Sequence, residues 1–153
     1  MTSWRPAMQG VFFIMNKQTI LDDLQKRCAN TFVTTLGVEF TDVGADYLVA
    51  RMPVTPSVLQ VDGVLHGGAT AGLAETVGSA ACAVLYKRED HILRGIEVSA
   101  NHVRGVRSGY VYARATALHH GRTMQHWQIL ITNDQDELVS SCKLTTITLP
   151  SKK

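Results

Sequence analysis

The sequence predicts a single α+β domain in which one long helix packs against an antiparallel sheet of about six strands. Its 153 residues are 45% apolar and 18% charged, which is typical of one globular domain. Residues 67–85 contain a single charged side chain, so they can form a buried helix. Four later segments are rich in β-branched and aromatic residues and are separated by turn signals, which indicates strands.

The N-terminal third predicts a short helix and two strands. Residues 19–29 form an amphipathic pattern with Thr19 as the helix N-cap, and we expect strands over 36–40 and 47–52. Pro53 then breaks regular structure, and a loop should follow to about residue 64. The domain is expected to cover 19–150.

Residues 1–18 are expected to form a disordered tail or an extension upstream of the true start. Met15 is then an alternative start to Met1, because a polar, helix-like stretch begins there. The apolar run within this segment is too short for the core of a signal peptide.

The predicted central helix, residues 67–85, is built largely from small side chains. Eleven of its nineteen residues are Gly, Ala or Ser, and we expect Gly72 and Gly78 to let the curved sheet approach closely. An apolar ridge should pack into that sheet; it consists of Leu73, Val77, Ala81 and Val84. A membrane span is disfavoured, because the segment holds a central Glu and stands alone.

Four strands should follow the helix and form an antiparallel meander. Their expected ranges are 92–103, 110–118, 124–132 and 138–149.

Glu75 is the single charged residue of the predicted helix, and we expect it to be buried. A buried carboxylate without a partner costs several kcal/mol. Two interpretations remain open from the residues. Glu75 could pair with an Arg or a backbone amide at a subunit boundary, or it could be a catalytic carboxylate with Ser79 one turn further along the same face.

His66, Gly67 and Gly68 open the same helix, where free N–H groups can bind developing negative charge. The alternative is an ordinary loop-to-helix turn. Gly67 and Glu75 are eight residues apart, or roughly 12 Å along a helix, so they cannot both reach one carbonyl. A two-fold dimer with antiparallel central helices would bring Glu75 of one chain to Gly67 of the other.

Composition and motif content exclude several function classes. The net charge of +2 is too balanced to indicate a nucleic-acid partner. The three cysteines are widely spaced, which argues against a disulfide framework and favours a reduced, cytoplasmic protein. No histidine spacing typical of a metal site, no phosphate-binding loop and no nucleophile elbow is present, so we expect no metal and no cofactor.

One segment carries a specific resemblance. QVDGVLHGG (60–68), followed by LAE (73–75) and GS (78–79), resembles the hotdog-fold acyl-CoA thioesterases. The chain is similar to the 4-hydroxybenzoyl-CoA thioesterase and phenylacetate-pathway type. Within that type it is most similar to the enterobactin-associated proofreading thioesterase and the 1,4-dihydroxy-2-naphthoyl-CoA hydrolase. The resemblance continues through EVSANHVR, LHHGR and SCKLTT and spans about residues 19–149.

The resemblance implies a hotdog fold, a homodimer or homotetramer, and an active site at the dimer interface. Glu75 would be the catalytic carboxylate, as nucleophile or general base, and the Gly67 amide the main oxyanion donor. His66 and Gln60 would orient the thioester, and Ser79 would lie near the attacking water. Candidates to bind coenzyme A, as part of the substrate, are Gly68, Arg104, His119, Arg122 and Thr123.

The resemblance leaves the acyl group open, because Asp62 stands where close relatives often carry an aromatic residue. Coenzyme A and an acyl-carrier arm are both possible thiol carriers, and the acyl group is expected to be aromatic or of medium chain length. Two alternatives remain: a non-catalytic module that binds acyl-CoA, and a dehydratase of 3-hydroxyacyl thioesters. No nucleic acid and no membrane partner is expected.

Overall fold

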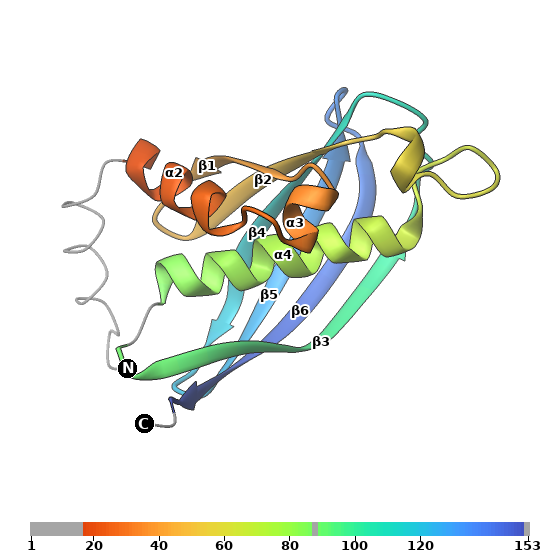
Figure 1. Cartoon of the computed structure of the whole chain (residues 1–153). Helices are drawn as coiled ribbons and strands as arrows, with labels where there is room; N and C mark the ends of the chain where they lie inside the picture. Colours follow the sequence, from red (N-terminus) through yellow and green to blue (C-terminus); the bar gives the residue numbers. More distant parts are fainter. Residues whose placement is uncertain (1–16, 87–88, 152–153) are drawn as a thin grey trace.

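A computed structural model describes residues 17–86 and 89–151 and shows a long helix against a curved antiparallel sheet (Figure 1). The sheet has six strands in the order β1-β2-β4-β5-β6-β3, and every neighbouring pair is antiparallel. The predicted α+β architecture is therefore confirmed. In chain order the elements are α2 (Lys17–Arg27), α3 (Phe32–Thr35), β1 (Glu39–Val43), β2 (Tyr47–Pro53), η1 (Pro56–Val58), α4 (Gly67–Leu85), β3 (His91–His102), β4 (Tyr110–His120), β5 (Met124–Asn133) and β6 (Leu138–Pro150).

The core lies between α4 and the inner face of the sheet. Three of the four predicted ridge residues, Leu73, Val77 and Ala81, are fully buried, as the periodicity predicts. The fourth, Val84, is half-buried and packs against the same core. Gly78 has no room for a side chain, because an added Cβ would lie 2.6 Å from Leu144 Cδ2. Among the described residues, α4 is the one helix whose length and composition would allow it to cross a membrane. Its contacts with β2 to β6 make it the core helix of this sheet.

The N-terminal elements differ from the prediction at both ends of the first helix and at the start of the first strand. Thr19 lies inside α2 instead of capping it, and α2 ends at Arg27, two residues before the predicted end. Helix α2 starts at Lys17, so residues 17 and 18 belong to the domain; the rest of the predicted tail lies outside the described residues. Residues 36–38 form a turn after α3 instead of a strand, with Gly37 at φ 68°, and β1 starts at Glu39. Gly72 faces α3 and not the sheet, because an added Cβ there would lie 3.2 Å from Phe32.

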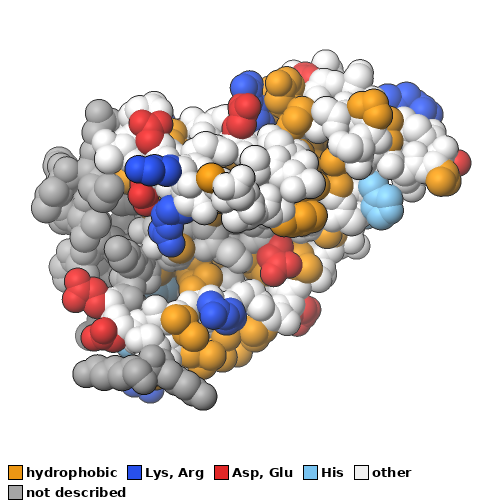
Figure 2. Space-filling model, viewed as in Figure 1, with side chains coloured by type: hydrophobic (Ala, Val, Ile, Leu, Met, Phe, Trp, Pro, Cys, Tyr) orange, Lys and Arg blue, Asp and Glu red, His pale blue; other side chains and the backbone are white. Residues whose placement is uncertain are grey.

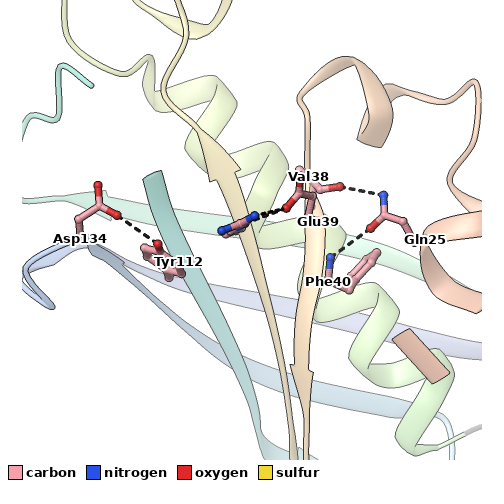
Figure 3. Close-up of polar contacts among 7 residues, drawn as sticks. Gln25, Val38, Glu39, Phe40, Tyr112 and Asp134 are labelled. Atoms are coloured by element: carbon pink, nitrogen blue, oxygen red, sulfur yellow. Dashed lines mark hydrogen bonds and ion pairs between the residues drawn. The ribbon is translucent and has the colours of Figure 1, made fainter. Parts of the chain in front are cut away.

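Helix α2 is held to β1 by an ion pair between Lys17 and Asp42 and by the side chain of Gln25. The amide group of Gln25 donates to the carbonyl of Val38 at 3.1 Å and accepts from the backbone N–H of Phe40 at 3.2 Å (Figure 3). Both bonds satisfy main-chain groups at the start of an edge strand. On the outer face the same strand is tied to β2, where Arg51 donates to Glu39 at 2.8 Å (Figure 3).

Strand β3 forms the other edge of the sheet and runs alongside α4 (Figure 1). It pairs with β6 alone, so its second backbone edge is open along twelve residues of the described chain. A bulge lies between Gly95 and Glu97, and Ile96 within it is 53% exposed. Figure 2 shows hydrophobic side chains gathered on this face over β3 and the adjoining side of α4. A long apolar edge of this kind favours pairing with another chain.

Candidate active site

The start of α4 presents a set of polar groups that are fixed by their hydrogen bonds. His66 is the N-cap residue, with extended backbone angles of φ −70° and ψ 132°, and its Nδ1 accepts from the Gly68 N–H at 2.8 Å. A neutral imidazole carries one proton, so this bond leaves the proton on Nε2 and makes His66 a donor to the site. The Gly68 amide is used in this cap, and a role of Gly68 in substrate binding stays a prediction.

Gly67 keeps its amide available. Across residues 17–86 and 89–151, no hydrogen-bond partner is recorded for the Gly67 N–H, as befits the first residue of a helix. Together with Nε2 of His66 it provides two donors at the positive end of the helix dipole. Hydrogen-bond donors at a helix N-terminus can stabilise an oxyanion.

The imidazole ring of His102 lies against Gly67 and leaves little room for a side chain there. A Cβ added to Gly67 would lie 2.8 Å from Nε2 of His102, at the end of β3. The other ring nitrogen of His102 is 3.1 Å from Oγ of Ser140 on β6. Ser140 is fully buried and donates its own proton to the carbonyl of Asn101 at 3.1 Å. His102 is therefore a polar neighbour of the oxyanion donors.

Gln60 is held near the same end by a tight turn. The backbone N–H of Gln60 donates to the backbone carbonyl of Val64 at 2.8 Å. Gly63 lies in the turn between them and has a positive φ of 73°. Nη1 of Arg107 donates to the carbonyls of Asp62 and Gly63, each at 3.2 Å. Arg107 thus fixes the loop that carries Gln60.

Glu75 lies at the surface of the single chain, so the prediction that it is buried is wrong for the protomer. Its Oε1 is 2.9 Å from the position that a Cβ of Gly95 would occupy, which shows that it rests over the bulge of the edge strand β3. No ion pair or hydrogen bond of its carboxylate is recorded among the described residues. Ser79 follows one turn further along α4 and is half-buried.

A hollow of about 260 Å³ adjoins the start of α4. Its walls are mostly apolar, and Phe32 on its rim is 61% exposed. The lining residues are Phe32, Leu36, Ser57, Val58, Leu59, His66, Gly68 and Ala69. A second, more polar hollow of about 280 Å³ lies between the loops 105–109 and 133–135 and contains none of the predicted site residues.

One chain does not bring the predicted coenzyme A ligands together. Arg104 lies at the end of the sheet near His66 and forms an exposed ion pair with Glu137 at 3.4 Å. His119, Arg122 and Thr123 lie in or beside the β4–β5 turn, near the C-terminal end of α4, where Tyr86 stacks on the ring of His120. The helix between these two ends is about 28 Å long. Among the described residues no cluster of His, Cys, Asp or Glu could hold a metal ion.

Sequence reasoning gave no role to His102 or Ser140, and it did not anticipate that Arg107 holds the loop at 62–63. Each acts through a residue far away in the chain: His102 through Gly67, Ser140 through His102, and Arg107 through the loop at 62–63. The available signals were weak. They were two adjacent glycines that require a close neighbour and a serine at an inward-facing strand position.

Comparison with known proteins identifies the family and the fold. The sequence model of the Thioesterase superfamily matches residues 62–140. A Haemophilus influenzae thioesterase of known structure is 40% identical with a TM-score of 0.83, and the match covers 87% of this chain and 92% of that one. A Pseudomonas aeruginosa thioesterase, crystallised as a Gln-to-Ala mutant, is 37% identical with a TM-score of 0.83, over 85% and 94% of the two chains. A Pasteurella multocida protein whose name describes it as an esterase is 40% identical over 134 residues, 86% of this chain and 94% of its own.

Proposed function

Because this chain belongs to the thioesterase superfamily, with the hotdog fold, and is a thioester hydrolase, we propose that it hydrolyses acyl-coenzyme A thioesters at the N-terminal end of α4. The observation that carries the proposal is the cap at this helix start, which leaves the Gly67 amide and Nε2 of His66 as two donors on adjacent residues. An acyl-carrier thioester has the same reacting group and is the second possible substrate.

The chemistry requires few groups. A thioester carbonyl is already electrophilic, so two donors that stabilise its developing negative charge and one carboxylate are sufficient. In the proposed reaction the carbonyl oxygen lies between the Gly67 amide and His66. Gln60 orients the thioester, and the carboxylate of Glu75 either activates water or attacks the carbonyl carbon. Ser79, on the same helix face as Glu75, would hold the water in the first of these routes.

The carboxylate must come from a second chain. Glu75 and Gly67 of one helix are separated by roughly 12 Å, which is too far for one carbonyl. The open edge of β3 and the exposed Ile96 beside Glu75 support a dimer in which two β3 strands pair antiparallel and the two α4 helices lie side by side. Each dimer would then hold two sites, each with donors from one chain and Glu75 from its partner. A homotetramer of two such dimers is the further assembly that we propose.

The acyl group is proposed to enter the apolar hollow beside His66. Its volume of about 260 Å³ and its rim residue Phe32 suit an aromatic or medium-chain acyl group better than a long lipid chain. This is compatible with the aromatic acyl-CoA subtypes that the sequence resembles.

The phosphates of coenzyme A would be bound through the partner's β4–β5 turn. In the antiparallel arrangement, the C-terminal half of the partner helix extends away from its Glu75 in the direction of this turn, which carries Arg122, Thr123 and His119. The start of α4 and the β4–β5 turn lie at opposite ends of the helix in one chain. In the proposed dimer, the start of α4 in one chain would lie close to the β4–β5 turn of its partner.

The test is a thiol-release assay over a panel of aromatic and medium-chain acyl-CoA thioesters. Glu75→Gln keeps the size of the side chain and removes its charge, so we expect turnover to fall by at least about 100-fold. Glu89→Gln is the matched control, because Glu89 is exposed in the turn before β3, far from the start of α4. No thiol release by the unmodified protein from any thioester, or release that Glu75→Gln leaves intact, would contradict the proposal.

A further inference from the structure

Two imidazoles flank Gly67, and their hydrogen bonds give them opposite roles. His66 accepts at Nδ1 from the Gly68 N–H, so its neutral ring offers an Nε2–H donor. Oγ of Ser140 lies 3.1 Å from the Asn101 carbonyl, 3.1 Å from Nδ1 of His102 and 3.3 Å from Sγ of Cys142. We assign the Ser140 proton to the Asn101 carbonyl, and in this assignment Nδ1 of His102 donates to Oγ. The neutral His102 ring therefore offers a lone pair at Nε2, which is the atom nearest to Gly67.

The same contacts locate His102 in the shared site. Gly67 lies level with His102, and Glu75 lies level with Gly95, both along α4 and β3 of one chain. A two-fold axis that brings the partner's Glu75 to Gly67 must also bring the partner's Gly95 opposite His102. Nε2 of His102 then faces the carboxylate that would activate the water.

We propose that His102 is a proton-transfer residue of this site, an inference that rests on the thioesterase function proposed above. The partner's Glu75 takes a proton from water as the oxygen bonds to the carbonyl carbon. Nε2 of His102 receives this proton from the carboxylic acid, and the C–S bond breaks as the ring passes the proton to sulfur. The hydroxyl group of the water ends in the carboxylic acid product and its proton ends on the thiol. Glu75 and His102 both return to their initial protonation states.

The role predicts a dependence on the leaving group. An alkyl thiolate, such as that of coenzyme A or N-acetylcysteamine, is a poorer leaving group than an aromatic thiolate, because its conjugate acid is weaker. Protonation of sulfur therefore accelerates loss of the alkyl thiolate far more than loss of thiophenolate. A residue that served only to shape the site would affect both substrates equally.

The experiment compares His102→Gln with the unmodified protein on two thioesters of one acyl group, with N-acetylcysteamine and with thiophenol. General acid–base catalysis contributes about 10²–10⁴-fold, so we expect kcat/KM to fall about 100-fold on the alkyl thioester and less than about threefold on the thiophenyl thioester. Ser140→Ala removes the group that orients the ring and should show the same selectivity with a smaller loss. His126→Gln, on the outer face of β5, is the matched control and should change neither rate.

Equal losses on both thioesters, or no loss on either, would overturn the role of His102 while leaving thioester hydrolysis in place. Failure of the proposed function itself would be seen separately, as absence of hydrolysis by the unmodified protein or as full activity of Glu75→Gln. Thermal unfolding of each variant identifies any loss of fold, and Ser140→Ala provides an independent test of the leaving-group pattern if His102→Gln is unstable.

Discussion

The shared site can be tested by mixing two inactive variants. His66→Asn removes the imidazole donor but keeps an oxygen that can cap Gly68, since Asn is among the best N-cap residues. Glu75→Gln removes the carboxylate. In a composite site, each variant alone disables both sites of its homodimer, because every site needs His66 from one chain and Glu75 from the other.

The expected recovery follows from the geometry. In a mixed dimer, one site receives both defects, and the other receives intact His66 from one chain and intact Glu75 from its partner. Random reassortment makes about half of the dimers mixed, so roughly a quarter of all sites should be intact. The two variants are unfolded together, refolded, and compared by thiol release with each variant refolded alone and with refolded wild-type protein.

Activity near a quarter of the wild-type value supports donors and carboxylate from different chains. Native mass spectrometry confirms that the chains have exchanged. If exchange is complete and activity stays at the level of the single variants, then the antiparallel arrangement is refuted. Glu75 would then have to act with groups of its own chain, despite the separation of roughly 12 Å along α4.

Three further outcomes are expected. Arg122→Ala should raise KM for an acyl-CoA and spare an N-acetylcysteamine thioester, which lacks the phosphates; equal losses on both would place Arg122 elsewhere. Gly67→Ala should displace the His102 ring, because the new Cβ would lie 2.8 Å from Nε2. Its stability cost, about 1–3 kcal/mol for overpacking, should largely vanish in a His102→Ala background, as measured by denaturant unfolding. Burial raises the pKa of Cys82 to about 11 and also raises the pKa of Cys142 and of Cys28. Cys82 and Cys142 are buried whereas Cys28 is half-buried, so a thiol reagent at pH 8 should label Cys28 before unfolding and all three cysteines after it.

The sequence predicted the elements whose signal is local and long. The range 67–85 agrees with α4 at both ends, and the four later strands agree within two residues. The error at 36–38 has a physical reason. The four-residue helix α3 is too short for a periodic signal, and Gly37 allows a left-handed turn that propensity alone does not reveal.

The candidate site was predictable only in part, because its geometry depends on contacts between distant segments. His66 and Gly67 could be inferred as candidate donors because they stand at the predicted start of the long helix. The cap between His66 and Gly68, and the ring of His102 against Gly67, depend on side-chain positions that no periodicity encodes. The burial of Glu75 was inferred from a helix without other charges, but one chain covers only part of that helix.

That partial cover is consistent with the proposed dimer, in which one α4 helix contributes the donors of one site and the carboxylate of the other. The side of α4 that meets the sheet is sealed by Leu73, Val77 and Ala81, whereas Glu75 remains open beside β3. Small residues on this open side, such as Ala71 and Ser79, would let a second α4 approach closely. If two copies join there, the surface left uncovered by one chain becomes the wall of the other chain's site. The carboxylate is then exposed in the protomer because its functional position is against the partner's oxyanion donors.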